Sequence, residues 1–163
     1  MAMAASILVL KRHVLQQYTR YGDVRMGKES KLTKAIKEVV EQNGEGRTDW
    51  IGAMANDDSL SLWSLPILGD LLEFFRPYFI LLVSHDRIVI NKMSFRDDIQ
   101  ASQGISRDEL KSFVFKKGKL SSKVRMTLAD GKAYKFSFMP AKLLFGHADD
   151  QVKALEILEG FQK

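Results

Sequence analysis

The chain has 163 residues, of which 45% are hydrophobic and 28% are charged, and this composition is typical of a globular domain. It contains no cysteine and only three widely spaced histidines, which excludes disulfides, thiol catalysis and cysteine zinc sites. The apolar run Ala4–Leu10 is short and precedes its basic residues, and no stretch reaches the roughly 20 apolar residues of a membrane span. We therefore expect a cytoplasmic protein, at most peripheral to a membrane, with no metal and no cofactor.

The net charge of +5 is concentrated in one block. Residues 111–142 carry nine lysines and arginines against Asp130 alone, whereas residues 51–110 carry five basic against nine acidic side chains. Such a block creates a local positive potential. Two interpretations stay open: the lysines solvate the outer face of a sheet, or they bind an anionic partner.

The first 47 residues have the helical period. Apolar side chains recur at three- and four-residue steps over Ser6–Tyr21 and again over Lys31–Gln42, where Asn43-Gly44 is a typical helix end with a left-handed residue. We predict an N-terminal helical extension over residues 1–47 and a separate domain over residues 48–163.

The next segment predicts a strand and then an apolar helix. Trp50–Ala55 reads as a strand ended by the turn residues Asn56-Asp57-Asp58. Ser64 is a candidate N-cap with Pro66 just inside the helix that follows. This helix is either core or a docking surface for another protein, and its candidate interaction residues are Leu68, Leu71, Leu72 and Phe75.

A hairpin and a less regular segment come next. Tyr78–Val83 and Arg87–Met93 are apolar, β-branched runs joined by a short polar turn, which is a hairpin signal. Ser94–Gly104 is polar and has no periodicity, so we expect a loop there. Ser106 and Glu109 have the spacing of a capping box and predict one short helical turn.

Three further strands are predicted as an antiparallel meander over Phe113–Lys117, Lys123–Leu128 and Tyr134–Phe138. Apolar and basic side chains alternate along them, and Asp130-Gly131 is a tight-turn pair. One face should therefore be buried and the other basic. The candidate residues for binding phosphate or lipid are Lys116, Lys117, Lys119, Lys123, Arg125, Lys132 and Lys135.

A last helix is predicted after Asp149-Asp150, whose negative charges favour a helix N-terminus. Its expected apolar stripe consists of Val152, Leu155, Leu158 and Phe161. The element order is then helices, consecutive antiparallel strands and one closing helix, which is an α+β arrangement.

This order and three local patterns resemble the bacterial pleckstrin-homology-like (PH-like) domains, which include a GRAM-like branch. The patterns are the hairpin Phe79–Ile90, the segment Ile105–Phe113 that leads into the second sheet, and Asp130-Gly131-Lys132 between paired strands. The resemblance covers roughly Thr48–Phe161 and implies a bent antiparallel sheet, close to a barrel, with the last helix closing one end. Some relatives bind phosphoinositides and others bind proteins, so the fold alone does not select a partner.

The sequence lacks the motifs of an enzyme: there is no glycine-rich phosphate loop, no GxSxG and no HExxH. The acid pairs Asp57-Asp58, Asp97-Asp98 and Asp149-Asp150 fall in predicted turns or at a helix start, where Asp suits the local backbone. The meander's aromatic side chains should face away from its lysines, which argues against nucleic-acid binding. No small-molecule substrate is indicated. We expect a non-enzymatic module that binds a protein or self-associates; the alternative is peripheral binding to anionic lipid head groups.

Overall fold

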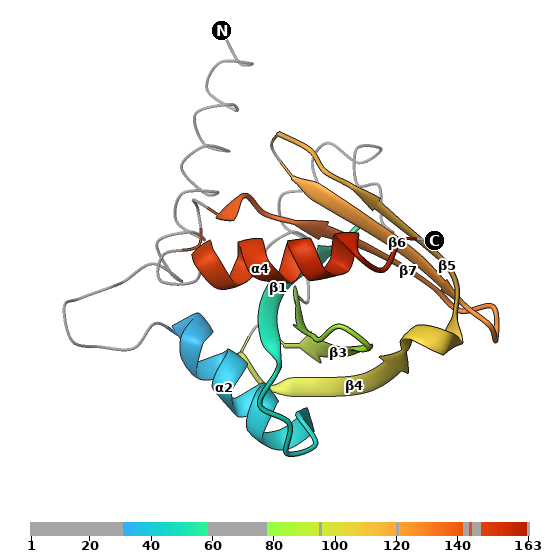
Figure 1. Cartoon of the computed structure of the whole chain (residues 1–163). Helices are drawn as coiled ribbons and strands as arrows, with labels where there is room; N and C mark the ends of the chain where they lie inside the picture. The colour runs from blue at the N-terminus through green and yellow to red at the C-terminus, as the bar shows by residue number, and fades with distance from the viewer. Residues whose placement is uncertain are drawn as a thin grey trace, which may run out of the picture.

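The computed structural model describes residues 31–58, 78–94, 96–119, 121–141, 144 and 148–162. Within them lie two α-helices, a short 3-10 helix and one antiparallel sheet (Figure 1). The elements in chain order are α2 (Lys31–Asn43), β1 (Ile51–Asp57), β2 (Tyr78–Val83), β3 (Arg87–Met93), β4 (Ile99–Ser106), η2 (Arg107–Glu109), β5 (Leu110–Lys116), β6 (Ser122–Leu128), β7 (Ala133–Phe138) and α4 (Ala148–Glu159). The predicted helix over Ser6–Tyr21 and the apolar helix that ends at Phe75 lie outside the described residues.

The sheet has seven strands in the order β4-β3-β2-β1-β7-β6-β5. Strands β1 to β4 form one meander and β5 to β7 form a second, and the two join where Ala55–Asp57 of β1 pairs with Phe136–Phe138 of β7. In Figure 1 the two halves of the sheet are inclined to each other, and α4 lies across the β1 side. A seven-stranded antiparallel sheet with a C-terminal helix fits the PH-like α+β fold that the sequence predicts; the GRAM-like branch and a bacterial origin stay predictions.

The main core lies between the two halves of the sheet and α4. It contains buried side chains from both meanders, among them Leu81, Ile88, Phe113 and Phe136, and the α4 side chains Ala154 and Leu158 together with Phe161 just beyond the helix. Phe113 and Phe161 approach with ring centroids 5.6 Å apart. The closing helix therefore covers apolar surface that the bent sheet would otherwise expose to water.

A second apolar cluster lies on the opposite side of the first meander, under α2. Leu32, Ala35 and Val39 of α2 are buried against a group of strand residues that includes Ile80 and Leu82 of β2. Strands β2 and β3 are thus covered on both faces, which explains why they read as continuous apolar runs. Although α2 belongs to the predicted N-terminal extension, it is packed on the sheet; the boundary at residue 47 stays a prediction.

The hairpin, α2 and the capping box were predicted correctly, and three predictions about turns and loops were wrong. Asn56 and Asp57 continue β1 because they pair with β7, so the turn does not begin there. Ser94–Gly104 is not a loop throughout, since Ile99–Ser106 forms β4 against β3. The left-handed residues after α2 are Glu45 and Gly46.

The buried stripe of α4 also differs from the prediction. Val152 is 44% exposed, whereas Gln151 is 1% exposed. The Gln151 amide accepts a hydrogen bond from the Met54 N–H and donates one to the Met54 carbonyl, each at 3.0 Å. Met54 lies on β1 just before the pairing with β7 begins, so Gln151 supplies the partners that a neighbouring strand supplies elsewhere. Because the Gln151 side chain must point at Met54 to form these hydrogen bonds, the next residue on α4, Val152, faces outward.

Within the described residues, neither α-helix combines the length and the apolar character needed to cross a membrane.

Candidate functional site

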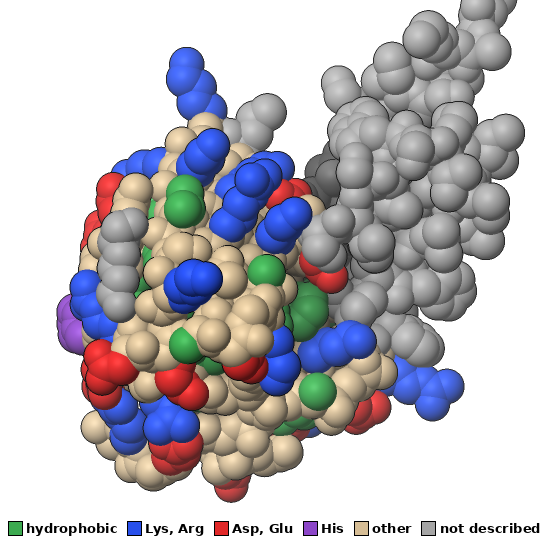
Figure 2. Space-filling model, turned by 90° about the vertical axis from the view of Figure 1, so that its right-hand side faces the viewer, with side chains coloured by type: hydrophobic (Ala, Val, Ile, Leu, Met, Phe, Trp, Pro, Cys, Tyr) green, Lys and Arg blue, Asp and Glu red, His purple; other side chains and the backbone are tan. Residues whose placement is uncertain are grey.

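The second meander presents an exposed basic face, formed by the outward side chains of β5, β6 and β7. In β6 the core-facing Val124 and Met126 are buried, while Lys123 and Arg125 are exposed. In β7, Lys135 is exposed between the half-buried Tyr134 and the buried Phe136. The predicted assignment of faces is therefore confirmed. Figure 2 shows Lys and Arg side chains gathered on the upper part of this side of the molecule, with apolar side chains among them.

The strand register opposes like charges on this face. Lys116 of β5 lies directly across from Lys123 of β6, and Arg125 of β6 lies directly across from Lys135 of β7. Directly opposed like charges destabilise a sheet by roughly 0.2–1 kcal/mol per pair. Val114 lies across from Arg125 and is 39% exposed. The face thus combines an apolar side chain with two repelling cationic pairs.

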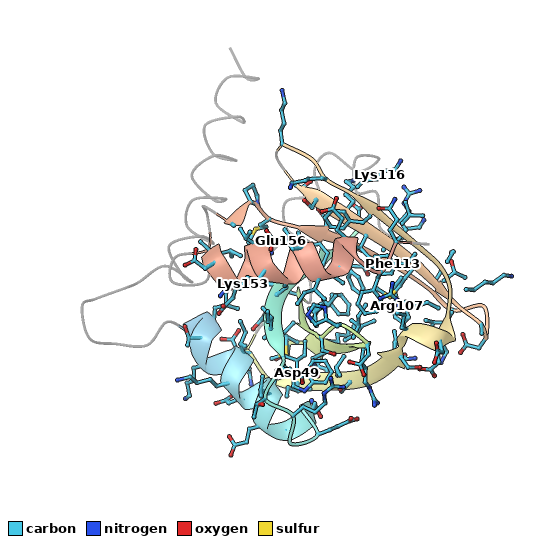
Figure 3. All side chains as sticks on the ribbon, in the orientation of Figure 1. Asp49, Arg107, Phe113, Lys116, Lys153 and Glu156 are labelled. Atoms are coloured by element: carbon cyan, nitrogen blue, oxygen red, sulfur yellow. The ribbon has the colours of Figure 1, made fainter. Side chains whose placement is uncertain are left out.

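The other candidate lysines lie in the turns at the two ends of the face. Lys117 and Lys119 are exposed in the β5–β6 turn, beside Lys116 at the end of β5. Lys132 is exposed in the β6–β7 turn at the opposite end, where its Nζ lies 3.5 Å from Asp130. The structure therefore groups six of the seven candidates and leaves Lys132 apart. Figure 3 shows Lys116 directed away from the sheet and Phe113 directed into the molecule.

Acidic partners neutralise only part of the face. Lys123 Nζ lies 3.0 Å from the Asp58 carboxylate, which also explains one member of the predicted acid pair Asp57-Asp58. Among the described residues, no carboxylate pairs with Lys116, Arg125 or Lys135. The face keeps a positive potential that an acidic partner would lower.

The aromatic side chains of the second meander belong to the core. Phe113, Phe115, Phe136 and Phe138 are all buried, and Tyr134 is half-buried with its hydroxyl donating to Gln103 of β4. Base stacking on single-stranded nucleic acid needs aromatic side chains exposed beside the basic ones. The described part of this face offers none.

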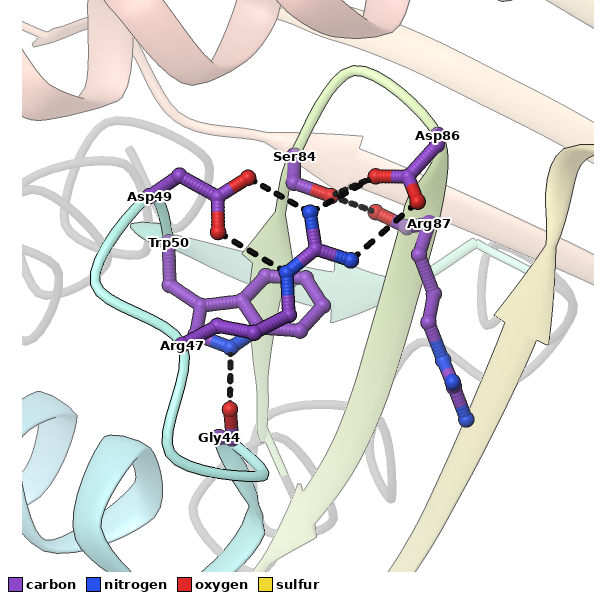
Figure 4. Close-up of polar contacts among 7 residues, drawn as sticks. All are labelled: Gly44, Arg47, Asp49, Trp50, Ser84, Asp86 and Arg87. Atoms are coloured by element: carbon purple, nitrogen blue, oxygen red, sulfur yellow. Dashed lines mark hydrogen bonds and ion pairs between the residues drawn. The ribbon is translucent and has the colours of Figure 1, made fainter.

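A polar cluster that the sequence analysis missed joins the α2–β1 loop to the β2–β3 turn (Figure 4). The Arg47 guanidinium donates to both Asp49 and Asp86, with the shortest contacts at 2.6 and 2.8 Å. It also lies over the Trp50 ring, whose Nε1–H donates to the Gly44 carbonyl at 2.7 Å. Arg47 and Asp49 are only two residues apart, but Asp86 lies 39 residues further along the chain than Arg47. No sequence motif therefore indicates that the three residues meet.

In the Arg47 cluster, one guanidinium forms ion pairs with two carboxylates, those of Asp49 and Asp86. Hydrogen bonds from the Arg47 guanidinium, and next from the Ser84 hydroxyl, lower the pKa of Asp86 well below its usual range. The pKa of Asp49 is also lowered, mainly by the hydrogen bonds from Arg47. The same two carboxylates raise the pKa of Arg47. Ser84, His85 and Asp86 form no catalytic triad here, because the Ser84 hydroxyl donates directly to Asp86 at 2.8 Å.

The remaining acid pairs have structural partners or capping positions. Asp97 has a positive φ of 69° and accepts a hydrogen bond from the Tyr78 hydroxyl at 2.7 Å. Asp149 and Asp150 lie in the first turn of α4. No group of three or more potential metal ligands occurs within the described residues.

The candidate docking residues lie outside the described residues and stay predictions; they are Leu68, Leu71, Leu72 and Phe75.

The sequence matches no protein-family model and no curated protein. Among solved structures, the chain is similar to the hSac2 domain from the human phosphoinositide phosphatase Sac2, with a TM-score of 0.43 and 12% identity, covering 82% of this chain and 84% of that chain. It is also similar to the pleckstrin homology domain of USP37, with a TM-score of 0.35 and 12% identity, covering 70% of this chain and 96% of that chain. Both TM-scores are below 0.5, so the PH-like description rests on this chain's own strand order and closing helix.

Proposed function

We propose that this chain is a non-catalytic binding module that recognises an acidic protein partner through the basic face of β5–β7. The observation that carries the proposal is the opposition of like charges at Arg125/Lys135, where no described carboxylate pairs with either side chain; at Lys116/Lys123 the Asp58 carboxylate already lies beside Lys123. A sheet that served only as a scaffold would be more stable with opposite charges at these positions. Carboxylates of a partner placed between the paired cations would remove the repulsion.

An acidic protein fits this face better than a bare lipid surface because of Val114. Protein interfaces combine an apolar centre with a polar and charged rim. Val114 is exposed beside Arg125, and Lys116 lies on the same face two residues further along β5. The partner we infer therefore carries acidic side chains around at least one apolar side chain.

A second candidate function is peripheral binding to anionic lipid head groups. It is favoured by one observation: three exposed lysines, Lys116, Lys117 and Lys119, gather at the β5–β6 end of the face. Each basic residue near an anionic membrane contributes about 1 kcal/mol to binding. The lipid interpretation therefore depends on the turn, whereas the protein interpretation depends on the middle of the face.

Two matched double variants separate these functions. Arg125→Glu with Lys135→Glu reverses the middle of the face, and Lys117→Glu with Lys119→Glu makes the same charge change in the turn. The probes are fluorescein-labelled Glu-rich peptides with and without a central Leu, and vesicles of neutral lipid with or without phosphatidylserine. Circular dichroism would verify that both variants are folded.

We expect the Leu-containing peptide to bind the wild-type protein more tightly at low salt, and the middle-of-face variant to weaken that binding by at least about tenfold. The turn variant should change it much less. Salt-sensitive binding to the phosphatidylserine vesicles alone, lost in the turn variant, would replace the proposal with the lipid function. Binding of neither probe would overturn both.

A further inference from the structure

One carboxylate of this chain already lies on the basic face of β5–β7. Asp58, the residue after β1, accepts two hydrogen bonds from the Lys123 ammonium, at 3.2 and 3.0 Å. The two residues are 65 positions apart in sequence, and β7 lies between β1 and β6 in the sheet, so this ion pair spans a strand. The chain therefore supplies its own example of the contact that an acidic partner would form with this face.

The backbone fixes the position of Asp58. Its N–H donates to the Lys135 carbonyl at 2.9 Å, one residue beyond the last β1–β7 pair. Asp58 thus lies across from Lys135, and residues directly across from each other point to the same face of a sheet. The Asp58 carboxylate nevertheless pairs with Lys123. Lys135 and its neighbour Arg125 keep no carboxylate partner in the part of the chain that the structure describes.

The strand register divides the cations of the face into two rows. In the first, which we call the open row, Arg125 lies across from Lys135. In the second, which we call the closed row, Lys116 lies across from Lys123, and Lys123 is held by Asp58. Side chains two residues apart on one face of a strand are separated by about 7 Å. An acidic segment with two carboxylates about 7 Å apart matches both rows.

We propose that Asp58 regulates the basic face as an internal competitor for the second carboxylate of a partner. The inference rests on the proposed function and deepens it. The first carboxylate binds the open row without displacing any group, whereas the second meets only Lys116 until Asp58 releases Lys123. The exchange is feasible because the side chains of Lys123 and Asp58 are 47% and 26% exposed, and exposed ion pairs are weak.

Two variants and two peptides test the competition. Asp58→Asn removes the competing charge and keeps the backbone N–H that bonds to Lys135. Asp130→Asn is the matched control, because it removes the same charge from an ion pair in the β6–β7 turn, 3.5 Å from Lys132. Both peptides contain a central Leu. One has Glu-x-Glu beside it, which matches the two rows in an extended chain, and the other has Glu-x-Gln.

Dissociation constants would be measured by amide NMR titration at low salt. Asp58→Asn should tighten binding of the Glu-x-Glu peptide by about two- to fivefold, the range of one exposed ion pair, and change that of the Glu-x-Gln peptide much less. Asp130→Asn should change neither appreciably. Equal tightening for both peptides, or for both variants, would show a general charge effect and overturn the competition. Binding of neither peptide to any of the proteins would overturn the proposed function as well.

The location of the shift changes provides a second readout. With the Glu-x-Glu peptide, the Lys123 amide should shift in the Asp58→Asn protein and much less in the wild type. Adding Lys123→Gln to Asp58→Asn should return the affinity to the wild-type value, because the released cation is then gone. Circular dichroism would verify that every variant is folded. A gain in affinity that survives Lys123→Gln would overturn the assignment of Lys123 as the cation that Asp58 withholds.

Discussion

A single buried glutamine connects the closing helix to the sheet. Gln151 is 1% exposed and satisfies both backbone groups of Met54, at a point where β1 has no partner in β7. An unsatisfied buried polar group costs about 1–3 kcal/mol. Gln151 therefore fixes both the rotation of α4 and its position along β1.

Replacing Gln151 by leucine should lower the free energy of unfolding by about 1–3 kcal/mol, because the Met54 N–H and C=O lose their partners while the apolar volume is kept. Urea unfolding followed by circular dichroism would measure this loss. The same substitution at the exposed Gln42 is the matched control and should have little effect. Equal effects at the two positions would show that Gln151 has no special structural role.

The Arg47 cluster makes stability depend on acid pH. Because hydrogen bonds from Arg47 lower the pKa of Asp86 in the folded state, its contribution to stability is fully present above the unfolded pKa of about 3.9. That contribution is lost as the pH falls below this value towards the folded pKa.

Asp86→Asn should therefore lower the melting temperature at pH 7, and its difference from the wild type should narrow as the pH falls from about 4 to 2. Thermal unfolding at a series of pH values measures the difference. Glu41→Gln, an exposed carboxylate on α2, is the control. A difference that stays constant between pH 7 and pH 2 would contradict the role of Asp86 in this cluster.

The direction of a side chain could be predicted wherever apolar and polar residues clearly alternate along a strand. Lys135 and Phe136 were assigned to opposite faces of β7 correctly, because alternation in a strand follows from backbone geometry. Val152 was assigned wrongly because the choice of buried face on α4 depends on a polar residue, Gln151, whose partner lies 97 positions away. No local hydrophobic pattern contains that information.

At the scale of elements, α2 depends on a close approach to β1. A Cβ atom built on Gly52 would lie 2.5 Å from Cγ2 of Ile36, which is much closer than real contacts allow. Ile36 is β-branched and cannot easily turn away within a helix. Gly52 therefore allows α2 to pack directly on the backbone of the sheet.

Gly52→Ala should destabilise the protein by about 1–3 kcal/mol through overpacking against Ile36. In the background of Ile36→Ala, which removes the obstructing branch, the same substitution should cost much less. Chemical unfolding of the four proteins forms a double-mutant cycle. Additive effects would mean that the contact between α2 and Gly52 does not limit the packing.

The second meander should gain stability when one of its repelling pairs is made attractive. Lys135→Glu places a carboxylate across from Arg125 and should raise the unfolding free energy by about 0.2–1 kcal/mol at low salt. The gain should shrink at high salt, because exposed charges are screened. Lys92→Glu, an exposed lysine of β3 paired with Phe79 and Ala101, is the control. A loss of stability in Lys135→Glu that is not shared by the control would contradict the repulsion.

Elements with a strong local pattern were predictable, and β4 was not. The β2–β3 hairpin has long β-branched runs and a short polar turn, so both strands were predicted with their observed bounds. Ile99–Ser106 lacks alternation, partly because glycine stands at position 104, where a Cβ would lie 2.6 Å from the Arg87 guanidinium. Its strand conformation comes from tertiary pairing with β3.

At the scale of the whole molecule, the two halves of the sheet have different roles. In the first meander, β2 and β3 are covered by α2 on one side and by the main core on the other, whereas β4 at the edge is largely exposed. The second meander buries one face and leaves the other exposed, basic and internally repulsive. The sequence predicted this basic face from composition and alternation. It did not predict the opposition of like charges, because register depends on the turns.

Backbone amide NMR can map the surface of this protein that contacts an acidic peptide. The isotope-labelled protein would be titrated at low salt with the Glu-rich peptide that contains a central Leu. We predict salt-sensitive shift changes centred on Val114, Lys116, Arg125 and Lys135, with α2 and the first meander unaffected. Shift changes centred on α2 or the first meander, or none up to millimolar peptide, would contradict the assignment of the basic face as the binding surface.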